Sequence, residues 1–224
     1  MRFDAVARVE SCESTQGLVD PSMAEGSYAV ADFQSAGRGR LGRTWEASHG
    51  SALLVSVLLK PPAGAVLPQV ALVAGIAVAD ALEELTGLAV QIKWPNDVML
   101  RRHKVCGILA EARDGAVVLG IGVNVNQRPV ELAERAGSLY SLTGRTWDRD
   151  EVLAAVLAAL GERYDAWRAG GLDAVYEGLG PRDFLRGRIV SVDGTSGVAD
   201  YIDRDGRLLI GGVPVESGEV VYER

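Results

Sequence analysis

Three glycines and three arginines alternate within one short stretch of the chain, Gly37-Arg-Gly-Arg-Leu-Gly-Arg43. Glycines let a backbone approach a ligand closely, and guanidinium groups bind phosphate or carboxylate oxygens through paired hydrogen bonds. A solvated basic loop is the simpler interpretation. However, the chain is acidic overall, with 30 acidic against 23 basic residues, so this concentration of donors is unusual. The stretch therefore predicts an anion-binding loop.

The same stretch also fits G-x-G-x-x-G, the pattern of a dinucleotide-binding turn. In that turn the glycines open a helix, whereas here the loop runs on through Trp45 to Gly50 and into an apolar strand. No acidic residue in positions 57–61 is available to bind a ribose. The context therefore argues against a dinucleotide-binding fold.

Two further polar runs follow, Lys93-Trp-Pro-Asn-Asp97 and Lys104-Val-Cys-Gly-Ile-Leu109. Taken alone, each lysine is an ordinary surface residue and Asn96-Asp97 is an ordinary turn. An ordered set of such runs is far more specific than any one of them. In contrast, His49, His103, Cys12 and Cys106 show no metal-ligand spacing.

The run from Gly37 to Trp45, the two lysine runs and Gly120-Ile-Gly-Val-Asn124 occur in this order. Together they resemble the catalytic module of the biotin protein ligases, and the resemblance extends from about Glu13 to the C-terminus. It implies an enzyme that joins biotin to ATP as biotinyl-5'-AMP, releases pyrophosphate, and then transfers biotin to a protein lysine. The acceptor it implies is the biotin carboxyl carrier domain of a biotin-dependent carboxylase. Because the match begins within the first fifteen residues, we expect the type that lacks an N-terminal DNA-binding domain.

The resemblance also implies roles for individual residues. It implies that Lys104, Arg40 and Asp97 are catalytic. It implies a biotin site at Ser14, Thr15, Gln34, Gly37, Arg38, Arg40, Lys104 and Gly107. It implies a nucleotide site at Arg40, Arg43, Trp45, Asn96, Asp97 and Asn124, with Lys93 in support. Mg²⁺ is expected with ATP, and no residue is assigned to it.

Two residues depart from the pattern of the family. Cys106 stands where many relatives have a small residue such as alanine, and Gln16 follows the Ser-Thr pair where asparagine is common. Neither position belongs to the predicted phosphate chemistry.

Hydrophobic periodicity predicts the elements that position these residues. We expect a helix start at Glu13–Leu18, and strands at Ser27–Gln34, Ser51–Lys60, Leu88–Trp94, Val105–Ala112 and Ala116–Val125, the last two joined by an Asp114-Gly115 hairpin turn. Helices are expected at Leu67–Leu85, Val130–Ala136 and Arg149–Trp167. The pattern indicates an α+β fold, with a mixed, largely antiparallel sheet and helices on one face.

From Pro181 onward the chain changes to short β runs separated by glycine-containing turns. They are expected at Phe184–Val192, Gly197–Ile202, Arg207–Ile210 and Glu219–Tyr222. We therefore predict two domains, a catalytic one over 1–180 and a small SH3-like β-barrel over 181–224. About forty residues are marginal for independent stability, so the second should pack against the first.

The composition limits the classes of partner and the location that we expect for this protein. The net charge of −7 and the lack of a long basic run argue against nucleic acid as a partner. No apolar stretch is long enough to span a membrane, no leader-like segment is present, and only two cysteines occur, so a soluble cytoplasmic protein is expected. An edge strand of the sheet leaves both a monomer and a homodimer open.

Two alternative functions compete with the ligase. A lipoate or octanoate ligase resembles this fold and also uses a lysine, but it should lack the runs at Gly37–Trp45 and Lys93–Asp97. A non-catalytic biotin-binding sensor would keep the pocket without turnover. The joint presence of Lys104, Arg40 and Asp97 argues against the sensor.

Overall fold

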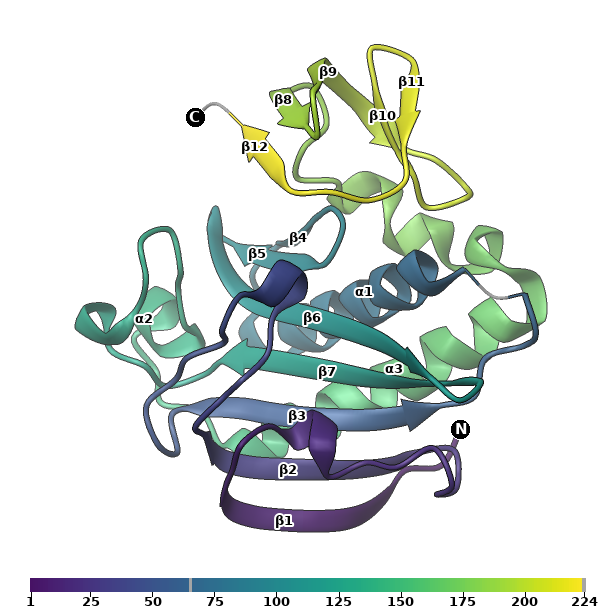
Figure 1. The fold of residues 1–224 in the computed structure, drawn as a ribbon. Coiled ribbons are helices and arrows are strands. Elements are labelled where there is room, and N and C mark those ends of the chain that lie inside the picture. The colour runs from purple at the N-terminus through teal and green to yellow at the C-terminus, as the bar shows by residue number, and fades with distance from the viewer. Residues whose placement is uncertain (65, 223–224) are drawn as a thin grey trace.

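The computed structural model describes residues 1–64 and 66–222. Within this part of the chain, a seven-stranded sheet forms the body of the protein and a five-stranded sheet lies above it (Figure 1). The order of the large sheet is β1-β2-β3-β7-β6-β5-β4. The strands are β1 (Asp4–Cys12), β2 (Ser27–Gln34), β3 (Ala52–Leu59), β4 (Val90–Lys93), β5 (Asp97–Leu100), β6 (His103–Arg113) and β7 (Ala116–Asn124).

All neighbouring strands of this sheet are antiparallel, except that β1 and β2 run parallel. The β6–β7 pair is the hairpin that the Asp114-Gly115 turn predicts: both residues have positive φ, at 48° and 77°, as a tight two-residue turn requires. The mixed, largely antiparallel sheet is therefore confirmed.

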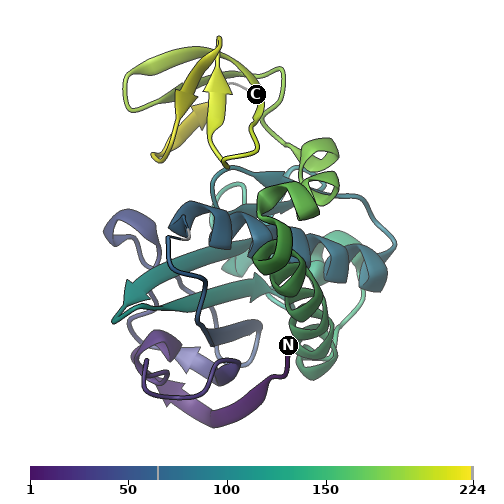
Figure 2. The ribbon, with the colours of Figure 1, turned by 90° about the vertical axis from the view of Figure 1, so that its right-hand side faces the viewer.

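Two long helices cover one face of the large sheet, α1 (Leu67–Thr86) and α3 (Arg149–Gly170), and both lie on the same side of it (Figure 2). Helix α1 ends because Gly87 adopts a left-handed conformation and its amide bonds the carbonyl of Glu83. Helix α3 begins at Asp148, whose side chain accepts a hydrogen bond from the amide of Asp150. The shorter helical segments are α2 (Leu139–Thr143), η1 (Thr15–Gly17), η2 (Arg40–Gly42), η3 (Pro129–Glu131), η4 (Leu172–Gly178) and η5 (Gly180–Arg182).

Several local expectations were wrong. The helices expected at Glu13–Leu18 and Val130–Ala136 are single 3₁₀ turns, η1 and η3. Val130 is 91% exposed, so it buries no apolar surface that would hold a longer helix. The sequence also predicts a turn at Pro95-Asn96-Asp97, but the turn lies one residue earlier, over 94–96, because Asp97 already pairs with Lys93 as the first residue of β5.

The smaller sheet contains β8 (Ile189–Val192), β9 (Thr195–Ile202), β10 (Leu208–Ile210), β11 (Val213–Val215) and β12 (Val220–Tyr222), in the order β11-β10-β9-β8-β12. The expected barrel is wrong, because the outer strands β11 and β12 do not pair within the described residues. Both contain only three residues, which leaves few backbone groups to close a barrel. Tyr222 instead packs edge-on against Phe184, with ring centroids 5.5 Å apart.

One buried cluster runs through both sheets and both long helices. Trp94, at the end of β4, is completely buried and donates from Nε1 to the carbonyl of Gly206 at 2.9 Å. Gln69 on α1 likewise donates to the carbonyl of Asp205 at 3.0 Å. The smaller sheet therefore packs against the body as expected, while the domain boundary at 180/181 stays a prediction.

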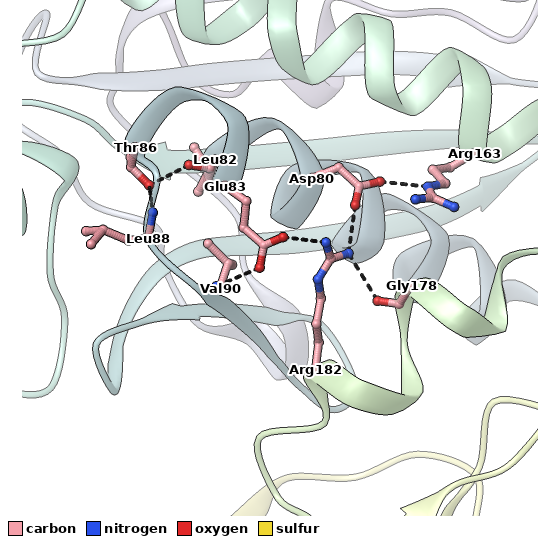
Figure 3. A network of polar contacts seen from close by, with 9 residues as sticks. All are labelled: Asp80, Leu82, Glu83, Thr86, Leu88, Val90, Arg163, Gly178 and Arg182. Atoms are coloured by element: carbon pink, nitrogen blue, oxygen red, sulfur yellow. Dashed lines mark hydrogen bonds and ion pairs between the residues drawn. The ribbon is translucent and has the colours of Figure 1, made fainter.

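A charged network fixes the segment that leads into the smaller sheet (Figure 3). The guanidinium of Arg182 lies 2.7 Å from an oxygen of Asp80 and 2.5 Å from Glu83, both on α1. The second oxygen of Asp80 lies 2.6 Å from Nε of Arg163 on α3. Burial opposes the charge of Arg182, but its bonds to Glu83 and Asp80 prevail and hold its pKa above the ordinary value. No helix in the described ranges is both long and apolar enough to cross a membrane.

Replacing Arg182 should destabilise the protein. In Arg182→Met, Glu83 loses its cation and Asp80 keeps only Arg163, so half-buried carboxylate charge is left poorly compensated. We expect the free energy of unfolding in urea to fall by about 2 kcal/mol. Arg2→Met is the control, because Arg2 is 88% exposed in its ion pair with Asp4 and should change stability by less than about 0.5 kcal/mol. Equal effects of the two substitutions would contradict this account.

Candidate active site

A pocket of about 940 Å³, counting its open mouth, lies on the face of the large sheet opposite the helices. Side chains alternate along β3, so Leu53, Val55 and Val57 join the helices in the core, while Leu54 and Ser56 point the other way. The segment that follows β2 crosses in front of β6 and β7 (Figure 1). The hollow therefore lies between this segment and the open face of the sheet.

The arginine-rich segment forms the wall over this pocket, and its own backbone bonds shape it. The amide of Gly39 bonds the carbonyl of Arg43 at 2.7 Å, and the amide of Trp45 bonds the carbonyl of Gly37 at 2.9 Å. An added Cβ at Gly37 would lie 2.3 Å from the carbonyl oxygen of Trp45, so only glycine fits at this position. The segment is therefore a short hairpin that carries its arginines at the pocket mouth.

The indole of Trp45 packs on a floor made by Gly107 and Gly122, which are direct cross-strand partners on β6 and β7. Ideal Cβ atoms at these two glycines would be 2.7 Å and 2.6 Å from indole carbons. Nζ of Lys104 lies 5.7 Å from the centre of the ring, within cation–π range. The two glycines are therefore what allows Trp45 to close one side of the pocket.

One end of the pocket is cationic. Nζ of Lys104 lies 2.7 Å from Asp97 and Nζ of Lys93 lies 3.6 Å from the same carboxylate. Arg40 donates to the side-chain oxygen of Asn96 at 3.2 Å, and the amide group of Asn96 donates to the carbonyl of Ile108 at 2.9 Å. Asn96 therefore ties Arg40 to β6, and Asp97 orients both lysines.

Burial shapes the electrostatics of this end. Burial lowers the pKa of Lys93, and the nearby charge of Asp97 offsets only part of that effect. Burial also lowers the pKa of Arg40, whose guanidinium stays protonated because its ordinary value is so high. Two lysines thus share the carboxylate of Asp97 in a half-buried place with Arg40 nearby, which suits the binding of a further anion.

The other end is polar and neutral. The side-chain oxygen of Gln34 accepts from the amide and the hydroxyl of Thr15 at 2.7 Å and 3.0 Å. The hydroxyl of Thr15 also lies 2.8 Å from that of Ser56, which is completely buried. Ser14 lines the same end. The pocket therefore matches a ligand with a neutral polar head and an anionic tail.

The structure gathers most of the predicted site residues around this pocket. They are Ser14, Thr15, Gln34, Arg38, Arg40, Arg43, Trp45, Asn96, Asp97, Lys104 and Gly107. Gly37 acts through the hairpin and does not line the pocket. Asn124 does not line it either: its amide donates to the carbonyl of Gly137 at 3.0 Å and accepts from Gln127 at 2.9 Å.

Comparison with known proteins assigns the family. The model of the biotin/lipoate A/B protein ligase family matches residues 9–127. The chain belongs to this family. It is 36% identical over 235 residues to the biotin–[acetyl-CoA-carboxylase] ligase of Mycobacterium tuberculosis, which covers 99% of this chain and 85% of that protein. It is also 36% identical over 209 residues to the bifunctional ligase/repressor BirA of Bacillus subtilis. That alignment covers 86% of this chain and 64% of the length of the relative.

A solved structure of this family supports the same assignment. The biotin protein ligase from Aquifex aeolicus in complex with biotin and ATP superposes with a TM-score of 0.87 at 35% identity, over 99% of this chain and 98% of that chain. The match covers the large sheet, the pocket and the smaller sheet. The architecture is therefore that of this solved member of the family.

Several residues that line this pocket were not predicted from the sequence. Glu219, which pairs with Arg43, and Gly218 and Val220 line it from the end of the smaller sheet. Ser56 lies in a strand where every residue is buried, so alternation could not indicate which face it occupies. Gln16 was noted only as a departure from the usual asparagine, although it too lines the pocket.

The contact between Gly122 and Trp45 can be tested by fluorescence. In Gly122→Ala, the new methyl group should displace the indole, raise its quenching by acrylamide and lower the free energy of unfolding by about 1–3 kcal/mol. The signal is selective, because Trp94, Trp147 and Trp167 are buried while Trp45 is partly exposed. Gly17→Ala is the control, since nothing lies within 4 Å of an added Cβ there. Unchanged quenching in Gly122→Ala would show that the indole does not lie on this floor.

Proposed function

We propose that this protein is a biotin protein ligase, which makes biotinyl-5'-AMP from biotin and ATP and then transfers biotin to a protein lysine. The observation that carries the proposal is the single pocket with a neutral end at Thr15 and Gln34 and a cationic end at Arg40, Lys93 and Lys104. Biotin has matching ends, a ureido ring and a carboxylate. The names of the relatives and the ligands of the Aquifex aeolicus structure support the same assignment.

Biotin lies in this proposal with its ureido ring toward Ser14, Thr15 and Gln34. Gly37 and Arg38 close the hairpin over it, and Gly107 lets Trp45 and Lys104 lie close to β6 beside it. The carboxylate then points toward Lys104 and Arg40, whose charges the protein already holds in place through Asp97 and Asn96.

The first step joins two anions. A carboxylate oxygen of biotin attacks the α-phosphorus of ATP, the bond from that phosphorus to the β-phosphate bridge breaks, and pyrophosphate leaves with the electron pair. Negative charge grows at the α-phosphate during this attack, so donors that are fixed beforehand lower the barrier. Lys104 and Arg40 are the two donors placed to do so. Asp97 keeps Lys104 oriented toward the reacting atoms.

The nucleotide occupies the side of the pocket near Arg43, Trp45, Asn96 and Asp97, with Asn124 behind it. Mg²⁺ accompanies ATP and neutralises part of the triphosphate charge. Within the described residues, no three His, Cys, Asp or Glu side chains gather as a metal site. Asp97, a carboxylate that lines the pocket, would be the side chain to hold the ion, and the phosphates of ATP would supply further ligands.

The second step transfers biotin to the acceptor. The amine of a lysine attacks the carbonyl carbon of the mixed anhydride, an amide bond forms, AMP leaves and the amine loses a proton. We take the acceptor to be the biotin carboxyl carrier domain of a biotin-dependent carboxylase, a class consistent with the relatives' names. Both cysteines are free, as is usual in a reducing compartment, which supports the cytoplasm as the location.

The chemical role of Lys104 can be tested directly. Lys104→Ala should form biotinyl-5'-AMP about a hundredfold more slowly, because one preorganised donor is worth about 3 kcal/mol in such a transition state. The measurement is pyrophosphate release with biotin, ATP and Mg²⁺, with the adenylate identified by mass spectrometry. Lys60→Ala is the matched control, since Lys60 is exposed and lies outside the pocket.

Two results would overturn the proposal. If the wild type binds biotin but makes no adenylate, the protein is a biotin-binding sensor. If the wild type releases pyrophosphate with lipoate or octanoate and not with biotin, it is a lipoate-type ligase.

A further inference from the structure

Trp94 is a completely buried side chain to which the proposed mechanism gives no role, although it stands inside the run Lys93–Asp97. Other members of this run orient the cations of the pocket. Asp97 bonds both pocket lysines, and Asn96 bonds Arg40. A shift of the run would therefore move several groups of the site together, so the contacts that hold Trp94 bear on the chemistry.

The run lies at one end of the large sheet. It joins β4 to β5, and β4 is the last strand in the order of that sheet. Each of these two strands has only four residues, so their hairpin contributes little backbone pairing of its own. On the outer side of β4, the carbonyl of Ile92 accepts from the amide of Phe184 at 3.0 Å. The segment that leads into the smaller sheet therefore covers this edge, and the position of the hairpin depends on it.

Trp94 makes a further contact with the smaller sheet itself. Its Nε1 donates to the carbonyl of Gly206 at 2.9 Å, in the turn between β9 and β10. The turn is braced from within, because the side chain of Asp203 accepts from the amides of Asp205 and Arg207, both at 2.9 Å. It also fits closely against the body, since an ideal Cβ at Gly206 would lie 3.1 Å from a side-chain carbon of α1. The indole N–H therefore ties the run to a well-fixed point.

We propose that Trp94 is a positioning residue, whose indole N–H fixes the run Lys93–Asp97 to the smaller sheet and so sets the geometry of Lys104 and Arg40. This inference rests on the proposed ligase function. Adenylate formation needs both cations in place before charge grows on the α-phosphate. A displacement of about 1 Å in such groups can slow a reaction about a hundredfold. Trp94 thus acts on the reaction through its neighbours in the run.

The test separates the rate of the chemical step from the binding of biotin. Trp94→Phe keeps an aromatic ring and removes the N–H. We expect the single-turnover rate of pyrophosphate release at saturating biotin and ATP to fall about tenfold. The biotin concentration that gives half of this rate should change by less than about twofold. Thr15 and Gln34, which hold the neutral end, lie on η1 and β2, far from β4 in the order of the sheet.

A matched control is present in the chain. Trp167 on α3 is also buried, and its Nε1 donates to the side-chain oxygen of Gln69 at 3.0 Å. Gln69 in turn donates to the carbonyl of Asp205, next to Gly206, so both indoles serve the docking of the same turn. Trp167 is not among the described residues that line the pocket. Trp167→Phe should therefore lower the urea midpoint of unfolding about as much as Trp94→Phe does, and leave the single-turnover rate unchanged.

A second variant reaches the same contact from the other side, in case Trp94→Phe does not fold. Asp203→Ala leaves Trp94 intact and removes the acceptor that braces the turn, so that the carbonyl of Gly206 can shift. We expect the same slower turnover with unchanged half-saturation by biotin, and an unchanged rate would contradict the inference. Asp205→Ala is its control, because it takes from the same turn only an exposed carboxylate that pairs with Arg207.

The outcomes separate the two proposals. No pyrophosphate release by the wild type with biotin overturns the ligase function and this inference with it. If the wild type is active and Trp94→Phe slows the single turnover no more than Trp167→Phe does, Trp94 contributes only stability and this inference alone is overturned. Weaker half-saturation by biotin without a slower turnover would place the effect at biotin binding, and it would also overturn the inference.

Discussion

The pocket exists because three positions on one face of β6 and β7 carry no side chain. Gly107 and Gly122 are cross-strand partners, and Gly120 pairs with Leu109 on the same face. On the opposite face, Ile108 and Ile121 are buried against the helices. The same two strands therefore close the core on one side and leave a hollow on the other. Everything that binds in this hollow depends on that difference between the two faces, because an added Cβ at each glycine would collide with a pocket side chain.

A second constraint is the placing of three cations near one carboxylate. Asp97 bonds Lys93 and Lys104, Asn96 bonds Arg40, and burial still lowers the pKa of Lys93 and of Arg40. Such an arrangement is costly in the free protein and becomes favourable when an anion arrives. The close, partly buried cations that make the free site unfavourable would thus also make it select a carboxylate or a phosphate.

The sequence predicted the parts of the fold and site that are encoded in contiguous runs. The loop glycines and arginines, the Lys93–Asp97 run and the β6–β7 hairpin all carry local signals, and the structure brings their residues to one pocket. Strand β1 was missed because it is an edge strand whose residues are mostly exposed, so it has no apolar alternation. The barrel was wrong because closure depends on pairing between distant short strands, which no local pattern reports. Glu219 was missed for a similar reason: its contact with Arg43 joins segments far apart in the chain.

The smaller sheet is therefore part of the site and more than an appendage to it. Glu219 pairs with Arg43 of the loop hairpin, and Nζ of Lys93 lies 5.2 Å from the ring centre of Tyr222. Arg182 fixes the base of this sheet to α1, which also packs behind β6. Because Arg43 pairs with the residue just before β12 and Lys93 lies over the last residue of β12, any displacement of that strand changes the surroundings of two cations at once. The charges that we assign to phosphate binding thus depend on packing between the two sheets as much as on the motif that contains them.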